Sequence, residues 1–154
     1  MEANTVAMEA AREFLGRAQA LRREIENKER RIQTLRDMAE STTGKMSDMP
    51  RSDSPNLQRM ETVLCKAADL EMEVAEDQAR LDGIKEEITA ALGELTDYRE
   101  QEILYYRYVG CMSWSGIMAE CGFSRRTILR RNQEGIEHLA AIQAGNAGTA
   151  MAHP

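Results

Sequence analysis

The sequence predicts an all-α protein in which a long N-terminal antiparallel helical hairpin, a coiled coil, precedes a small three-helix helix-turn-helix domain. Three observations predict this fold. The composition of the 154 residues favours helices, with 30% charged residues, 5% aromatic residues and three prolines. Apolar residues recur at heptad spacing over two long stretches. A short turn then separates two helical segments between Ser113 and Leu139.

The first predicted helix covers residues 5–40. Its apolar residues alternate by three and four positions, and charges of both signs lie between them. A narrow apolar seam of this kind is typical of coiled-coil packing. The seam contains Ala7, Ala11, Phe14, Ala18, Leu21, Ile25, Lys28, Ile32, Leu35 and Ala39.

Residues 41–56 interrupt this pattern with one glycine, two prolines and many small polar residues, so they are predicted to form a flexible surface loop. Apolar residues spaced by seven from Met60 to Leu95 then predict a second helix of about 35 residues. The hairpin and its loop together make up a first domain, residues 1–95.

Two polar residues interrupt the predicted seams, Lys28 in the first helix and Asp77 in the second. In an antiparallel alignment whose opposed residue numbers sum to about 99, Lys28 faces Glu71 and Asp77 faces Arg22. A polar seam position costs stability but selects one alignment. We expect these pairs to set the register, and the exposed remainder of the seam to drive formation of a homo-oligomer.

The helix-turn-helix domain is predicted to cover residues 96–142. Asp97 can cap its first helix, with Glu100 as a capping-box partner, and Gly110 ends that helix. The small residues of 143–154 predict a disordered tail.

Two serines and a glycine predict the turn between the second and third helices of this domain. Ser113 and Ser124 can each cap a helix, because a serine hydroxyl accepts from the unpaired N–H groups of a first turn. Gly122 can adopt the left-handed conformation that a tight turn needs, and Gly135 permits close approach of a neighbouring helix. The predicted core residues are Ile103, Leu104, Tyr106, Arg107, Trp114, Ile117, Met118, Ile128, Ile136 and Leu139.

The third helix opens with four guanidinium groups within seven residues. A helix-turn-helix that reads double-stranded DNA inserts its second helix into the major groove, N-terminus first. The chain carries a net charge of −6, but residues 97–139 sum to zero, so the acidic excess lies in residues 1–96. Clustered charge on the docking face matters more for phosphate contact than the total. The candidate DNA-binding residues are Ser124, Arg125, Arg126, Thr127, Arg130 and Arg131.

Residues 99–139, REQEILYYRYVGCMSWSGIMAECGFSRRTILRRNQEGIEHL, resemble region 4 of the sigma-70 factors, the domain that reads the −35 promoter element. The matching residues are Arg99, Glu100, Leu104, Arg107, Tyr108, Trp114, Ile117, Gly122, Ser124, Thr127, Ile128, Arg131, Ile136 and Leu139. Residues 20–140 also resemble a group of phage and prophage proteins. Those proteins join a helical hairpin, an MPRS-type loop (Met49–Ser52) and a DLE-type motif (Asp69–Glu71) to such a C-terminus.

The resemblance implies a phage-type, sequence-specific DNA-binding transcription regulator, because some of those relatives regulate phage late genes. By position, Ser124 to Thr127 and Arg130 would face the groove, while Arg131 would hold phosphate. Arg126 stands where primary sigma factors commonly have an acidic residue, so a different base preference is expected. Nothing in the chain is similar to region 2, which melts DNA, so we expect a regulator working with the host RNA polymerase.

Two other functions remain open. A small-terminase-like DNA-packaging recognition subunit also combines a helix-turn-helix with a coiled coil. A non-DNA-binding interaction protein would use the same helices to contact RNA polymerase. A separate alternative is that the four arginines of the third helix form a solvated face that pairs with Glu120, Glu134 and Glu137.

Other classes are disfavoured by the absence of their motifs. The sequence has no glycine-rich phosphate loop, no HExxH motif and no nucleophile–base pair, so neither an enzyme nor a cofactor is expected. Three widely spaced cysteines and two histidines predict no metal site and no disulfide scaffold. Without a long apolar run or a signal peptide, we expect no membrane partner and a location in the cytoplasm of a bacterial host cell.

Overall fold

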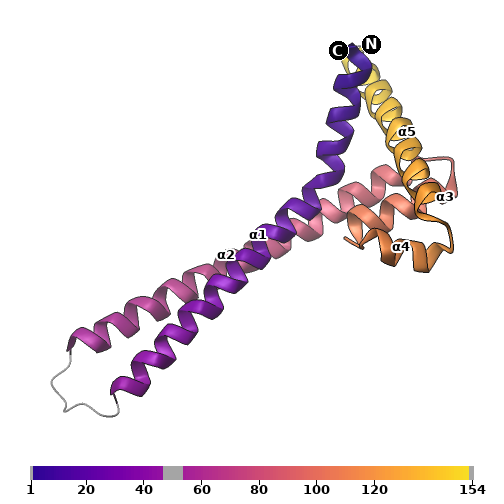
Figure 1. The fold of residues 1–154 in the computed structure, drawn as a ribbon. Coiled ribbons are helices and arrows are strands. Elements are labelled where there is room, and N and C mark those ends of the chain that lie inside the picture. Colours follow the sequence, from indigo (N-terminus) through magenta and orange to yellow (C-terminus); the bar gives the residue numbers. More distant parts are fainter. Residues whose placement is uncertain (1, 47–53, 153–154) are drawn as a thin grey trace. The chain divides into compact units, whose positions relative to one another are not determined.

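The computed structural model describes residues 2–46 and 54–152, and over these residues the protein is all-helical, as predicted (Figure 1). Two long helices come first, α1 (Glu2–Met46) and α2 (Ser54–Leu92). Three further helices follow, α3 (Tyr98–Leu104), α4 (Trp114–Cys121) and α5 (Arg125–Ala152), and α3 continues directly into the π-helical turn η1 (Tyr105–Val109).

The chain divides into two compact units. Leu21–Leu81 form one of them, here called the helix-pair unit. The residues up to Ala20, together with those from Asp82 onward, form the other, here called the C-terminal unit. Both α1 and α2 therefore contribute residues to each unit.

In the helix-pair unit α1 and α2 lie side by side and run in opposite directions (Figure 1). Small and aliphatic side chains at positions of the predicted heptads fill the contact. The buried residues are Leu21, Ile25, Ile32, Ala39, Val63, Ala67, Leu70 and Leu81.

The predicted register of these two helices is wrong. Lys28 Nζ lies 2.6 Å from Asp77 Oδ2, and Arg36 pairs with Glu71. The opposed residue numbers therefore sum to 105 at Lys28–Asp77. In this alignment the two polar seam positions satisfy each other, which the predicted alignment would have prevented. Asp77 is only 2% exposed, so a direct cationic partner is what makes its burial tolerable.

Both long helices extend into the segment that was predicted to be a loop. Residues 41–46 continue α1, and residues 54–56 begin α2. Pro55 occupies the first turn of α2, where a missing N–H costs nothing. The remainder of the predicted loop, including the MPRS-type motif, lies outside the described residues.

The predicted disordered tail is also wrong for most of its length, because α5 continues to Ala152. The segment from 140 to 152 is rich in alanine, the residue with the highest intrinsic helix propensity. This propensity and the uninterrupted hydrogen-bond ladder from the packed part of α5 outweigh the small residues that suggested disorder.

The end of the α3–η1 segment is shaped by Gly110 and Cys111 in different ways. Cys111 has φ +53°, so the left-handed position of this helix end is not a glycine. Gly110 has an ordinary φ, but a Cβ added there would lie 2.9 Å from the Tyr106 carbonyl oxygen. Gly110 therefore permits close passage of the backbone over the last helical turn.

The C-terminal unit is organised by close packing of α5 on α3. A Cβ added at Gly135 would lie 2.9 Å from Leu104 Cδ1 and 3.3 Å from Glu100 Cβ. Leu104 is fully buried, so it has little room to move. The absence of a side chain at Gly135 thus lets the two helices approach, as the sequence predicted.

Replacing Gly135 by alanine is expected to lower the free energy of unfolding by about 1–2 kcal/mol, because overpacking exceeds the gain in helix propensity. Gly83→Ala is the matched control, since a Cβ there meets nothing within 4 Å. That variant should be neutral or more stable by up to about 1 kcal/mol. Urea denaturation followed by circular dichroism measures both, and a Gly135→Ala protein as stable as the control would refute the packing argument.

Removing the cation of the Lys28–Asp77 pair should destabilise the protein more than removing the whole pair. Lys28→Met leaves a buried carboxylate, so its melting temperature should fall, whereas Lys28→Met with Asp77→Leu should recover it. The hydrogen bond from Lys28 lowers the pKa of Asp77, so this stabilisation is present above the ordinary aspartate pKa and lost as pH falls through the lowered one.

The pH dependence provides an internal check on this pair. The deficit of Lys28→Met against wild type should be constant from about pH 5 to pH 9 and shrink in more acidic solution. Arg80→Ala serves as control and should change the melting temperature little, because Arg80 also contacts Asp77 but is largely exposed. A double variant less stable than Lys28→Met would contradict the account.

Candidate nucleic-acid interface

Three isoleucines hold α3, α4 and α5 together. Ile103, Ile117 and Ile128 are fully buried and form one cluster, with one residue from each helix. All three were predicted core positions. Half-buried side chains complete the cluster, namely Tyr106, Met112, Trp114, Met118, Cys121 and Phe123.

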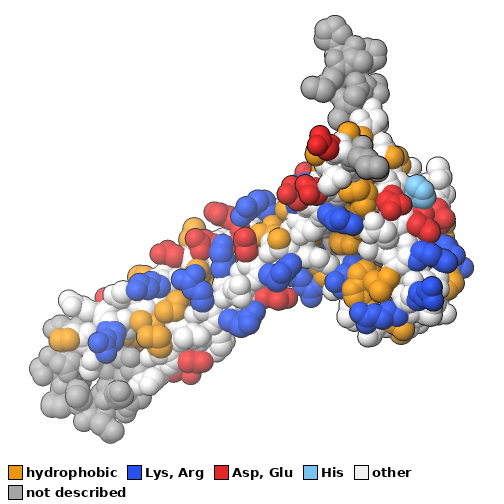
Figure 2. Space-filling view, turned by 45° about the horizontal axis from the view of Figure 1, so that its top comes forward, with side chains coloured by type: hydrophobic (Ala, Val, Ile, Leu, Met, Phe, Trp, Pro, Cys, Tyr) orange, Lys and Arg blue, Asp and Glu red, His pale blue; other side chains and the backbone are white. Residues whose placement is uncertain are grey.

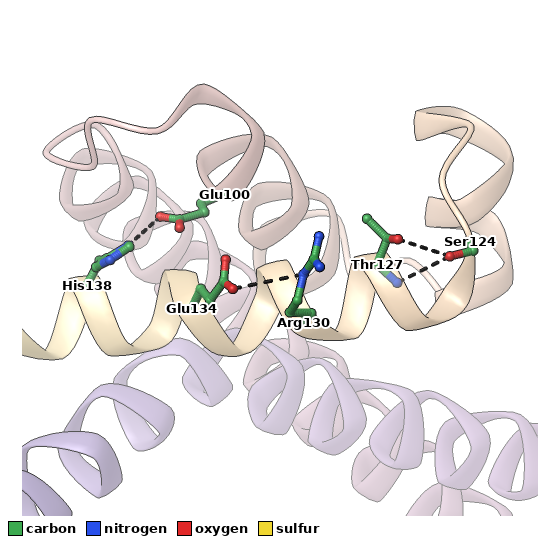
Figure 3. Close-up of polar contacts among 6 residues, drawn as sticks. All are labelled: Glu100, Ser124, Thr127, Arg130, Glu134 and His138. Atoms are coloured by element: carbon green, nitrogen blue, oxygen red, sulfur yellow. Dashed lines mark hydrogen bonds and ion pairs between the residues drawn. The ribbon is translucent and has the colours of Figure 1, made fainter.

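The connection between α4 and α5 has the predicted caps and turn. The Ser113 hydroxyl accepts from the Gly116 amide at 3.1 Å, and the Ser124 hydroxyl accepts from the Thr127 amide at 3.3 Å. Gly122 ends α4 with φ +71°, the left-handed conformation expected of it. Ser124 also donates to Thr127 Oγ1 at 3.0 Å (Figure 3). The left-handed Gly122 and the two Ser124 bonds set the direction in which α5 begins, while the Ser113 bond caps the start of α4.

Arg125 and Arg126 form the first turn of α5, and both are exposed. Within the part of the chain that the structure describes, neither guanidinium makes an ion pair or a hydrogen bond to a side chain. The N-terminus of a helix carries partial positive charge and unpaired N–H groups. Two free arginines at this position therefore add to a surface that already favours an anion.

Arg130 and Arg131 have different surroundings. Arg130 Nε lies 3.9 Å from Glu134 Oε1 one turn later, a loose pair between two exposed side chains (Figure 3). Arg131 is half-buried, and its guanidinium carbon lies 5.3 Å from the centre of the Phe123 ring. Its Nε is buried without a hydrogen-bond partner among the described residues. Of the four arginines at the start of α5, Arg130 is thus paired with an acidic residue, as expected if these arginines were only a solvated surface.

Phe123 brings a fifth arginine to this surface. The Arg99 guanidinium carbon lies 5.1 Å from the same ring, so two arginines from different helices contact one aromatic side chain. Cation–π contact holds a guanidinium in place while its N–H groups stay available. Sequence reasoning missed this arrangement, and the aromatic residue directly after Gly122 was its only signal.

Basic side chains gather visibly on the surface of the C-terminal unit around an apolar area (Figure 2). The six predicted residues lie at the start of α5 or, for Ser124, directly before it, and four of them are exposed, namely Ser124, Arg125, Arg126 and Arg130. Thr127 and Arg131 are half-buried and face the turn.

A further arginine, Arg107, has a structural role. Its guanidinium carbon lies 4.3 Å from the Trp114 ring centre, and its Nη1 donates to the Met112 carbonyl oxygen at 2.9 Å. Its own carbonyl oxygen accepts from Gln19 Nε2 at 2.9 Å. Arg107 thus connects η1 to the start of α4 and to α1 within the C-terminal unit.

Glu100 and His138 form a contact that the sequence did not predict. His138 Nδ1 lies 2.7 Å from Glu100 Oε2, which joins α5 to α3 one turn from Gly135 (Figure 3). The carboxylate is 2% exposed. Its hydrogen bond raises the pKa of His138 above the usual 6.5, and the charge of Glu100 acts in the same direction.

Two other groups in this unit have shifted pKa values. Burial raises the pKa of the Cys121 thiol and, separately, the pKa of the Tyr106 hydroxyl. Both groups are therefore protonated near pH 7. The described residues contain no group of three or more histidine, cysteine or acidic side chains that could hold a metal ion. No helix within the described ranges has the length and apolar character needed to cross a bilayer.

The Glu100–His138 contact predicts how His138 titrates. Because Glu100 favours the charged imidazole, its pKa in the folded protein should lie above 6.5, and Glu100→Gln should move it down. The stability that the contact contributes is complete below the unfolded-state pKa and is lost as pH rises through the raised one. NMR titration of the imidazole resonances measures the shift, and an unchanged midpoint in Glu100→Gln would contradict it.

Comparison of the chain with protein-family models, with curated proteins and with solved structures found no match.

Proposed function

We propose that the protein is a phage-type, sequence-specific DNA-binding transcription regulator. In this proposal α4 and α5 are a helix-turn-helix similar to sigma-70 region 4, and α5 enters the major groove N-terminus first. The helical hairpin of α1 and α2, a coiled coil, assembles copies of the chain. The regulator acts beside the host RNA polymerase in the bacterial cytoplasm.

The observation that carries the proposal is the pair Arg125 and Arg126, whose guanidinium groups bind no other side chain among the described residues. Both are exposed in the first turn of a helix whose start is fixed by Ser124 and Gly122. An arginine can bridge O6 and N7 of a guanine with two hydrogen bonds, which discriminates against other bases by about 1–3 kcal/mol. Unpaired guanidinium groups can make such bonds without first breaking an ion pair.

The neighbouring residues support a division of labour on the same surface. Ser124 donates to Thr127 Oγ1, so the Thr127 methyl group is the part suited to a thymine methyl. Arg130 is loosely paired and can exchange Glu134 for a phosphate. Arg99 and Arg131 are positioned against Phe123, and Arg99 Nη1 also lies 3.8 Å from Glu102 Oε2, a loose pair that a phosphate can replace. Both arginines suit the phosphates that set orientation and carry no base information.

A base-reading role predicts that Arg125→Ala and Arg126→Ala each reduce preference for the cognate duplex over a scrambled one by about 5- to 150-fold. Arg131→Ala should instead weaken binding to both duplexes and reduce the salt slope by about 0.9. The cognate duplex is selected with the full chain from a random library, and affinities are measured by fluorescence anisotropy at several salt concentrations.

Arg23→Ala is the matched control for these variants. It removes one exposed arginine from α1 in the helix-pair unit and should leave both affinities unchanged. If Arg125→Ala and Arg126→Ala bind the selected duplex like wild type, the proposed reading helix is wrong. If the wild-type chain selects no sequence and binds no duplex, the DNA-binding function itself is refuted.

A further inference from the structure

The α2 helix carries a second row of apolar residues that the packing with α1 does not use. Leu57, Leu64 and Met72 are 43%, 46% and 66% exposed. Exposed alanines continue this row at Ala68, Ala75 and Ala79. These six residues, here called the outer stripe of α2, follow one another at spacings of three, four and seven, so they share one helix face.

The outer stripe points away from α1. At 100° per residue, its mean direction lies roughly 140° around the helix axis from that of the buried seam residues. Along residues 21–41 of α1 the outward positions are polar, although Met38, to one side of them, is 50% exposed. The polar positions are Arg23, Glu26, Asn27, Arg30, Thr34, Asp37 and Ser41. The unused apolar surface of the helix-pair unit is therefore concentrated on α2.

The outer stripe is apolar except at Glu61, which lies between Leu57 and Leu64 on the same face. Exposed apolar surface is unfavourable in water by about 25 cal/mol per Å² and marks an interaction surface. The outer stripe is complementary to itself when two α2 helices cross antiparallel about Ala68. Leu64 then faces Met72 of a second copy, Leu57 faces Ala79, and Ala68 faces its own equivalent. Alanines at the centre permit close approach, while the larger side chains pack on either side.

The charges on α2 select the same arrangement. Residues 54–92 contain nine acidic and four basic residues, so two α2 helices repel unless their carboxylates are staggered. The antiparallel alignment about Ala68 places Glu61, Glu71 and Glu76 opposite Ala75, Cys65 and Met60 of the second copy. A parallel pairing in register would instead place every carboxylate beside its own equivalent.

We propose that two copies of this chain associate through the outer stripe of α2, antiparallel and with a twofold axis at Ala68. The α1 helices flank the two central α2 helices in a four-helix layer. This dimer is the way in which copies of the chain assemble in the proposed function, and the inference rests on that part of the proposed function alone. It holds or fails independently of DNA reading.

A charge placed in the stripe tests the proposal. Leu64→Glu buries two unpaired carboxylates in a symmetric interface, so it should raise the dissociation constant of the dimer by about 100-fold or more. Thr62→Glu adds the same charge at an exposed position outside the stripe and should leave the dimer intact. Sedimentation equilibrium measures both, and circular dichroism confirms that each variant stays helical.

Cysteine cross-linking tests the twofold axis. In a Cys65→Ser background, Ala68→Cys should form a disulfide-linked dimer under mild oxidation, because the two thiols meet on the axis. Ala75→Cys should not cross-link to itself, since it faces Glu61, but should cross-link when mixed with Glu61→Cys. Efficient self-cross-linking at Ala75, or none at Ala68, would overturn the antiparallel arrangement.

Two further outcomes separate this proposal from the DNA-binding function. A wild-type chain that is monomeric at tens of micromolar, or a Leu64→Glu variant as dimeric as Thr62→Glu, refutes the dimer whatever the DNA result. A dimer lost in Leu64→Glu, in a protein that binds no duplex, supports the interface and refutes only DNA reading.

Discussion

The close approach of α5 to α3 at Gly135 is the constraint on which the C-terminal unit depends. With no side chain at that position, Leu104 and Glu100 of α3 lie directly against α5. The same crossing buries the Glu100 carboxylate, which then needs the hydrogen bond from His138. Packing and polar pairing therefore act at one place, and each depends on the separation that Gly135 permits.

The contact at Gly135 holds the middle of α5, and the conformation of its first turn is set by Gly122 and Ser124. Ile128 fixes one face of α5 in the core, while Arg125 and Arg126 in the first turn are exposed to solvent. This explains how residues 97–139, whose charges sum to zero, present a local cluster of positive charge. Glu134 pairs with Arg130, and Glu100 pairs with His138. Both carboxylates therefore contact α5 beyond its first turn, away from Arg125 and Arg126.

Periodicity and capping rules predicted most of this unit, because those signals are local. The isoleucine core, the two serine caps and the left-handed Gly122 all follow from neighbouring residues. The missed features join residues distant in sequence, such as the Arg99–Phe123–Arg131 stack and the Glu100–His138 contact.

The long helices illustrate the same limit. Heptads identified the seam between α1 and α2 but not its register, since alternative alignments bury similar aliphatic side chains. The direct pairing of Lys28 with Asp77 decides between them. Leu15 is fully buried yet lay outside the predicted seam, because this part of α1 belongs to the C-terminal unit and packs in other surroundings.

The most direct test of the central claim is an NMR titration of the full chain with its selected duplex. The account predicts the largest amide shifts at residues 124–127, and shifts confined to the helix-pair unit would contradict it.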